Sequence, residues 1–453
     1  MSWAMLPPLE RVCVSQVCRD WRRVSLASPR LWTQVIFLST PWDGRTSELW
    51  PNVRERSKWD RKTIRNVFNP SPRSNNLAFF EELLSRSGQL PLDVTVLPPE
   101  RYLEIKQFSA VLGAHAHRIT RLHFRYCMFN DLELLLRKSG PLPALRTLTA
   151  GFDDRDVVYD HRPHQVTGTP QLPALRQAHF GADANVWGWD WKHAGLSSID
   201  ALTIVPEHGH HIVHALSSCP NLSSLTLVMS SFSEPWRTTE AFRMLTTRVQ
   251  AVCVCDMHKK ADVFIFELLC HPRSADITFD CRGHAAWSAA LPVPFSLIEQ
   301  PIHLTVGLKD GSYELDVVDS AQRRRRVFLE KRSIGTSPPL WPFWLRTQTV
   351  SAAVVDACAW SYFITGVPAS PSISDLTVVV RADPSELDAI SLAQLSSLER
   401  LHIDAPSSGL RFPRGAVSNL VCGVKLRILS LTATAAFEDV EELSSLAKSL
   451  EII

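Results

Sequence analysis

The sequence predicts an α/β protein, a leucine-rich-repeat-like solenoid of strand–helix repeats that follows a short helical segment. Three observations support this prediction. A short apolar pattern recurs at a nearly fixed spacing, helical segments lie between its copies, and proline precedes several of the predicted strands. A fixed period of this length indicates a repeat architecture, in which each unit buries its apolar face against its neighbours.

The recurring pattern is L-x-x-L-x-L, with other apolar residues allowed at the leucine positions. Its copies start at Ile119, Leu145, Leu175, Ile199, Leu222 and Val249, and again at Ile373, Leu398 and Leu426. Within each block, successive starts are 23 to 30 residues apart. A leucine-rich repeat has a period of about 20–29 residues and pairs a strand with a helix or helical turn. The last two apolar positions alternate, so we expect both to point to one face of the strand.

The segments between the copies supply the predicted helices. Residues 131–138 and 212–216 are typical of helices, and Pro143, Pro173 and Pro220 then separate helix from strand. Upstream, we expect a strand over 32–37, a helix over 75–87, a strand over 92–96 and a helix over 102–112. Polar positions between two buried strand residues would face a target; the predicted examples are Thr203, Thr226, Thr377 and His402.

Two segments interrupt the repeats. Residues 42–74 are polar and without a period, which indicates an exposed loop. Residues 303–330 instead alternate strictly, which predicts a hairpin with its turn at Lys309-Asp310-Gly311-Ser312 and a third strand at Val327 and Leu329. The predicted domains are a helical segment over 1–37, a polar linker over 38–76, and a repeat region over 77–453 with a β-rich insertion near 303–330. We expect a buried helix in the apolar window 347–367.

Composition excludes several classes of protein. The 453 residues include 48 Lys and Arg against 46 Asp and Glu, a net charge of +2, which argues against a dedicated nucleic-acid binder. The ten cysteines are scattered and do not indicate a disulfide framework. The first residues lack the charged and apolar regions of a signal peptide, and no apolar run reaches the length of a membrane span. We therefore expect a protein of the cytoplasm, the nucleus or both, without membrane partners.

The first thirty-five residues contain an amphipathic segment. Its predicted apolar helix face consists of Leu9, Cys13, Val17, Trp21 and Val24, spaced four, four, four and three residues apart. Arginines follow towards its C-terminal end, which suits the helix dipole. The sequence Ser28-Pro29 ends the helix, and Leu31-Trp32 follows as an apolar anchor.

This segment resembles the second half of an F-box. The resemblance rests on V-C-R-x-W-R over 17–22 and P-x-L-W over 29–32, at the spacing of the family. Residues 84–94 also resemble parts of large families of basidiomycete F-box-like proteins, whose downstream regions are irregular leucine-rich solenoids. The resemblance is specific over 6–37, weaker over 77–150, and architectural beyond.

The resemblance implies a non-catalytic adaptor. Such a protein docks on the Skp-family adaptor of a cullin-based ubiquitin ligase and holds a protein target on its solenoid for degradation. The residues implied in adaptor docking are Leu9, Val17, Cys18, Trp21, Leu31 and Trp32. The alternative for these residues is a helical cap that seals the first repeat.

One feature departs from the F-box pattern. Only eight residues separate Pro8 from Val17, too few for the first F-box helix as well as the second. The alternative function is therefore a leucine-rich interaction scaffold that no longer engages the ligase. Coding sequence upstream that supplied this helix would restore the ligase function.

Other clusters carry competing interpretations. His210 and His214 have the i, i+4 spacing of some zinc ligands, but a polar loop entering a helix is favoured. Cys253 and Cys255, with His258 nearby, alternate with valines, which favours two buried or half-buried strand cysteines over a metal site.

The run at 323–326, four arginines, is either a basic patch or a solvated strand edge. Trp187, Trp189 and Trp191 are possible target contacts if exposed, or structural if packed. The sequence contains no phosphate loop, no nucleophile elbow and no paired carboxylates at a catalytic spacing. We expect no enzyme activity, no cofactor and no metal.

Overall fold

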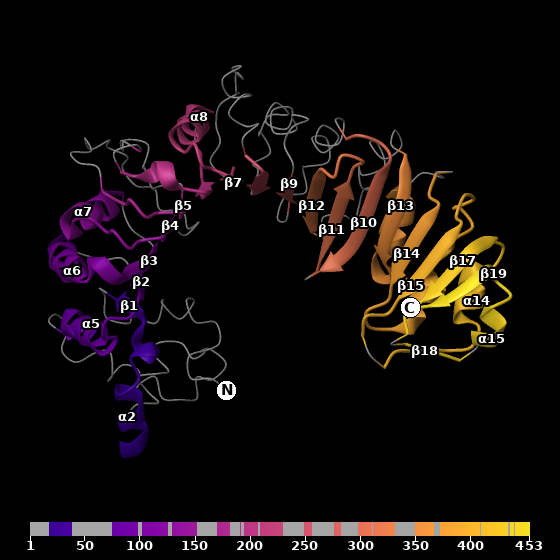
Figure 1. Ribbon diagram of the computed structural model, residues 1–453, viewed down its shortest axis with the longest axis horizontal. Helices are drawn as coiled ribbons and strands as arrows, with labels where there is room; N and C mark the ends of the chain where they lie inside the picture. The colour runs from indigo at the N-terminus through magenta and orange to yellow at the C-terminus, as the bar shows by residue number, and fades with distance from the viewer. Residues whose placement is uncertain are drawn as a thin grey trace. The chain divides into compact units, whose positions relative to one another are not determined.

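The computed structural model describes residues 18–38, 75–97, 102–125, 129–151, 170–181, 191, 194–206, 209–229, 249–255, 276–281, 298–309, 311–330, 349–366, 372–407, 409–433, 435–438 and 440–453. The chain divides into two compact units. Unit 1 comprises residues 1–205 and 210–222, and unit 2 comprises residues 206–209 and 223–453. Both are mixed α/β, and across the two units seventeen of the described strands belong to mostly parallel sheet (Figure 1).

Unit 1 contains six parallel strands that pair in chain order. They are β1 (Gln34–Leu38), β2 (Leu92–Leu97), β3 (Ile119–Arg125), β4 (Thr147–Gly151), β5 (Gln177–Phe180) and β6 (Ala201–Ile204). Helices α5 (Asn75–Arg86), α6 (Tyr102–Ala114) and α7 (Phe129–Ser139) connect the first four and lie on one side of them (Figure 1). Parallel neighbours require such crossover connections, which explains the strand–helix alternation.

Shorter elements complete unit 1. They are α2 (Arg19–Leu26), η2 (Pro29–Trp32), η4 (Ala116–Arg118), η6 (Leu196–Ser198) and α8 (Gly209–Ser218). The helices predicted over 75–87, 102–112 and 131–138 and the strand over 92–96 are confirmed within a few residues. The strand predicted over 32–37 starts at Gln34, because Trp32 still belongs to the 3-10 turn η2.

The strand alternation separates a buried face from a polar one. In β3, Leu122 and Phe124 are buried, whereas His123 between them is only half-buried. An aromatic cluster fills the core below β1, where the rings of Phe37 and Phe108 stack 4.2 Å apart and Phe80 packs edge-on against Phe37. Burial of these large side chains is the main stabilising contribution here.

A buried arginine connects the end of α5 to η4. The guanidinium of Arg118 donates to the Leu84 carbonyl at 2.7 Å and to the Ser87 Oγ at 2.6 Å. Ser87 in turn donates to the Leu84 carbonyl at 2.6 Å, and Gly88 follows with a φ of +59°. Helix ends leave carbonyls without intrahelical partners, so this cation and the left-handed glycine together cap α5.

Unit 2 contains eleven sheet strands in the order β7, β8, β9, β12, β11, β10, β13, β14, β15, β17, β19. Their bounds are β7 (Ser224–Val228), β8 (Ala251–Cys255), β9 (Asp276–Cys281), β10 (Ile302–Lys309), β11 (Ser312–Val318), β12 (Arg324–Glu330), β13 (Val350–Asp356), β14 (Asp375–Val379), β15 (Arg400–Asp404), β17 (Leu426–Leu431) and β19 (Ala447–Ile452). Strands β16 (Arg411–Phe412) and β18 (Ala436–Phe437) form a separate short pair.

The expected β-rich insertion is a three-stranded meander. β11 runs antiparallel to both β10 and β12, while β12 pairs in parallel with β9 and β10 with β13. The two-residue turn between β10 and β11 contains Gly311 with a φ of +74°, as a tight hairpin requires. The meander is thus inserted between parallel strands without ending the sheet.

Helical turns and helices follow several strands of unit 2. They are η9 (Ala357–Ala359), α13 (Trp360–Gly366), η10 (Pro384–Ala389), α14 (Ala416–Val421) and α15 (Val440–Leu443). The buried helix expected over 347–367 is wrong for its first half, since Val350–Asp356 is β13 and pairs with β10 and β14. A continuous apolar run suits a buried strand as well as a buried helix, and the strand pairing decided between them. In the described parts of both units, no helix has the length and apolarity to cross a membrane.

Candidate interaction surface

The polar face of unit 1 carries a row of aligned threonine and histidine side chains. Register pairs Thr95 with His123, His123 with Thr149, Thr149 with His179, and His179 with Thr203. We call these five residues the unit 1 ladder. All five are half-buried, while the strand residues on either side of each point to the core. The ladder therefore offers hydroxyl and imidazole groups in a line across five strands.

A second row beside the unit 1 ladder adds charge. The Asp93 carboxylate lies 3.5 Å from Arg121 Nη1 and 3.4 Å from His123 Nε2. Burial lowers the pKa of His179, so this imidazole is neutral at physiological pH. A neutral imidazole both donates and accepts hydrogen bonds, which suits recognition of polar partner groups.

The same strand position forms a longer row in unit 2. In sheet order, the unit 2 ladder consists of Thr226, Cys253, Thr278, Arg326, Asp316, Thr305, Val354, Thr377, His402, Ser430 and Glu451. His402 Nδ1 lies 3.2 Å from the Ser430 carbonyl oxygen, and Ser430 Oγ donates to Glu451 at 3.1 Å. At this end of the ladder, residues of neighbouring strands thus contact one another directly.

The four predicted polar strand positions all lie in these ladders and are half-buried: Thr203, Thr226, Thr377 and His402. Sequence reasoning missed His123 and His179, although both occupy the same position of their repeats. Listing the residue between the last two apolar positions of every copy would have found them. Whether any of these side chains contacts a target stays a prediction.

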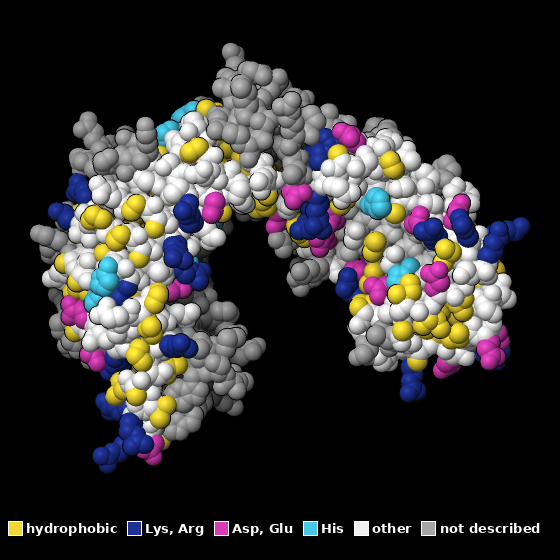
Figure 2. Space-filling view, in the orientation of Figure 1, with side chains coloured by type: hydrophobic (Ala, Val, Ile, Leu, Met, Phe, Trp, Pro, Cys, Tyr) yellow, Lys and Arg dark blue, Asp and Glu magenta, His cyan; other side chains and the backbone are white. Residues whose placement is uncertain are grey.

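The arginine run lies inside the sheet, and three of its four arginines, Arg323, Arg324 and Arg326, pair with carboxylates. Arg325 is buried, Arg324 is hydrogen-bonded to Asp316 at 2.7 Å, and Arg326 pairs with Glu314 at 3.1 Å. Figure 2 shows basic and acidic side chains side by side over the region of β9 to β12. Because β12 pairs with a strand on each side, the solvated strand edge expected from sequence is wrong.

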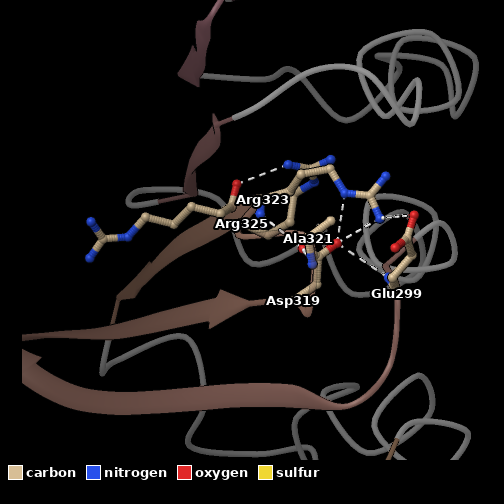
Figure 3. Close-up of polar contacts among 6 residues, drawn as sticks. Glu299, Asp319, Ala321, Arg323 and Arg325 are labelled. Carbon is tan, nitrogen blue, oxygen red and sulfur yellow. Dashed lines mark hydrogen bonds and ion pairs between the residues drawn. The ribbon is translucent and has the colours of Figure 1, made fainter.

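Asp319 is the centre of the polar contacts at the turn from β11 to β12 (Figure 3). Its side chain is fully buried and accepts from Arg323 Nε at 2.7 Å and from the amides of Arg323, Ala321 and Glu299 at 2.8, 2.9 and 3.2 Å. Burial alone would raise the pKa of Asp319, but these hydrogen bonds and the Arg323 charge outweigh it and lower that pKa. The cluster fixes the turn and is not free to bind an external anion.

The predicted adaptor-docking residues fall into three groups. Leu9 and Val17 lie outside the described residues, and for Trp21 the structure places only the backbone, within α2. Cys18 is exposed immediately before α2. Leu31 and Trp32 are buried, so the expectation that their side chains face a partner needs correction.

Trp32 anchors α2 to the rest of unit 1. Its indole Nε1 donates to the Ser25 carbonyl at 2.9 Å, and the Arg86 guanidinium lies 5.2 Å from the ring centroid. Among the side chains of α2 that the structure describes, the exposed large apolar ones are Val24, 57% exposed, and Leu26, 40% exposed. Figure 2 shows basic side chains gathered around this helix. Sequence reasoning placed Val24 on a packed face and did not single out Leu26.

The possible target contact Trp191 is also buried. It is 1% exposed and packs edge-on against Phe180 and His214, with ring centroids 6.1 and 5.3 Å apart. Its assignment as a surface contact is therefore wrong, because it fills the core behind β5. Trp187 and Trp189 lie outside the described residues.

The metal candidates are resolved in part. His210 is exposed and His214 half-buried against Trp191, and within the described ranges no group of three or more His, Cys, Asp or Glu could hold a metal ion. The predicted arrangement of Cys253 and Cys255 is confirmed, with both thiols half-buried on one face of β8. His258 lies outside the described residues.

Comparison with known proteins adds no family to this picture. No family model matches the chain, and no curated protein matches it.

Proposed function

We propose that this chain is a non-catalytic substrate-recognition subunit of a Skp–cullin–F-box ubiquitin ligase, built as a shortened F-box followed by an irregular leucine-rich solenoid. In this proposal α2 docks on the Skp-family adaptor, and the ladders hold a protein target. The solenoid proposal rests on the parallel strands that pair in chain order at the repeat spacing.

The observation that carries the docking proposal is the pair of exposed apolar side chains on α2. Of the large hydrophobic residues in the described part of the chain, only five are exposed, and Val24 and Leu26 are two of them. Both lie on the eight-residue helix α2, which also carries Arg19, Arg22 and Arg23. Because Val24 and Leu26 are two positions apart on the helix, they point to different sides of it, and each offers a separate apolar contact beside charged side chains.

Buried anchors hold this helix in place. Leu31 and Trp32 pack inside unit 1 and connect α2 to β1, so they support the docking surface without forming it. Their substitution would loosen α2 and weaken adaptor binding indirectly. In the ladders, hydroxyl, imidazole and carboxylate groups provide a polar surface suited to a target chain.

The test is co-purification of the full chain with a Skp-family adaptor. We expect stable binding by the wild type and at least a tenfold loss with Val24→Glu combined with Leu26→Glu. The control is Val354→Glu, which places one such charge at an exposed valine on β13 and should leave adaptor binding unchanged. Circular dichroism verifies that each variant is folded.

Absence of adaptor binding by the folded wild-type chain would refute the ligase proposal and favour the free-standing scaffold. Retention of binding by the double glutamate variant would remove α2 as the docking surface. For the target, proximity labelling with His123→Ala, His179→Ala should lose the proteins labelled by the wild type while adaptor binding persists.

A further inference from the structure

The two cysteines of β8 form a pair on the polar face of unit 2. Val252 and Val254 are buried, and the alternation of the strand directs Cys253 and Cys255 to the opposite face. Both are half-buried, and neither is disulfide-bonded. The pair is therefore partly accessible and held on a strand that is paired on both sides.

The sulfur separation suits chelation. The Sγ atoms of Cys253 and Cys255 lie 3.5 Å apart, within hydrogen-bonding distance of each other. Two sulfurs 3.5 Å apart and each about 2.3 Å from one ion subtend about 100° at that ion, which suits pyramidal arsenic; linear two-coordinate Cu(I) requires the two thiol side chains to rotate apart. A disulfide is less suitable, because side chains two positions apart on a strand have Cβ atoms about 6.5 Å apart, against about 3.8 Å in a disulfide.

The surroundings distinguish this pair from the other described cysteines. Register places Cys253 between Thr226 and Thr278, and Cys255 between Val228 and Asp280. Cys219 is buried, and burial raises the pKa of its thiol to about 12, which makes it inert. Cys358 and Cys422 are exposed but far apart in the chain, and neither has an adjacent cysteine.

We propose that Cys253 and Cys255 form a two-thiolate site for a thiophilic ion of the class of Cu(I) or trivalent arsenic. Soft ions of this class select thiolate ligands. The proposal departs from the expectation of no metal, because the separation of the two sulfur atoms is a property of the tertiary structure. It is independent of the ubiquitin-ligase proposal.

The chemistry needs no oxidant. A trivalent phenylarsenical oxide condenses with the two thiols, forming two arsenic–sulfur bonds and releasing its oxygen as one water molecule that carries both thiol protons. Binding of Cu(I) releases the thiol protons to solvent. Binding of Cu(I) should therefore weaken as the pH falls, because protons compete with the ion for sulfur.

The decisive experiment treats the full-length reduced chain with phenylarsine oxide in excess monothiol and measures the intact mass. We expect one phenylarsenic adduct on the wild type that a small dithiol removes. Cys253→Ser and Cys255→Ser should each abolish it, whereas Cys358→Ser and Cys422→Ser should retain it. Under reducing conditions, the Cys253→Ser, Cys255→Ser double variant should bind one Cu(I) fewer in competition with a chromogenic chelator.

A second measurement uses only the wild-type chain, in case a serine variant fails to fold. Alkylation followed by peptide mass mapping should show Cys253 and Cys255 protected by the arsenical, and Cys358 and Cys422 unprotected. Persistence of the adduct or of the full Cu(I) count in the folded double variant would overturn the proposal. So would an unprotected pair in the wild type.

Discussion

Gly113 permits the close approach of α6 and α7, and replacing it with alanine tests the packing of unit 1. A Cβ atom at Gly113 would lie 2.7 Å from the backbone carbonyl oxygen of Ser139, the last residue of α7. Ordinary contacts of this kind are at least about 0.5 Å longer. The obstacle is a backbone atom, so a rotamer change cannot relieve the overlap.

Two effects oppose each other in Gly113→Ala. Alanine gains about 1 kcal/mol in helix propensity over glycine. Overpacking against a fixed neighbour costs about 1–3 kcal/mol. Because the predicted overlap is severe, we expect the overpacking to dominate and the free energy of unfolding of unit 1 to fall by about 1–2 kcal/mol.

The assay is native-state hydrogen exchange of the α6 and α7 amides, which reports on unit 1 separately from unit 2. Ala110→Gly in the exposed part of the same helix measures the propensity effect alone, and should destabilise by about 1 kcal/mol. If Gly113→Ala instead stabilised α6 by about that amount, the close approach to Ser139 would be refuted.

Four further changes test other parts of the structure. Arg118→Met should destabilise unit 1 by about 1–3 kcal/mol, measured by urea unfolding, because the Ser87 oxygen loses its charged donor and the Leu84 carbonyl keeps only the Ser87 hydroxyl; an effect below about 0.5 kcal/mol would contradict the cap. Asp319→Asn should cost about 2–4 kcal/mol in unit 2, because Arg323, with a side chain only 10% exposed, loses its buried charge partner and keeps only the exposed Glu299. Unchanged exchange of the β11 and β12 amides would argue against this. Trp191→Ala should cost about 3–5 kcal/mol in thermal or urea unfolding, whereas a surface tryptophan would cost little. Burial lowers the pKa of His179, and burial together with the Arg118 charge lowers the pKa of His115. The unfolded chain therefore binds more protons than the folded chain below pH 6.5, so the free energy of unfolding of unit 1 should fall from pH 7 towards pH 5. His179→Gln should make this dependence on pH shallower.

The sequence determined which strand residues enter the core. In each copy of the repeat, apolar and polar residues alternate along a few neighbouring positions. Because these strands bury one of their two faces, the alternation predicts that Leu122, Phe124 and their equivalents are buried. The hairpin turn at Gly311 was equally local, because few residues adopt the positive φ that such a turn needs. The mixed α/β class followed from the same periodicities.

Only the tertiary structure decided which apolar surfaces are covered. Val350–Asp356 became a strand because β10 and β14 were available to pair with it, a long-range fact that its local run of apolar residues does not contain. The sequence does not distinguish whether Trp32 and Trp191 face a partner or the core. Trp32 is buried with its indole hydrogen-bonded to the Ser25 carbonyl, and Trp191 is buried against Phe180. The periodicity of apolar residues predicts which side chains are buried. The residues that cover them are distant in the sequence and are defined only by the tertiary structure.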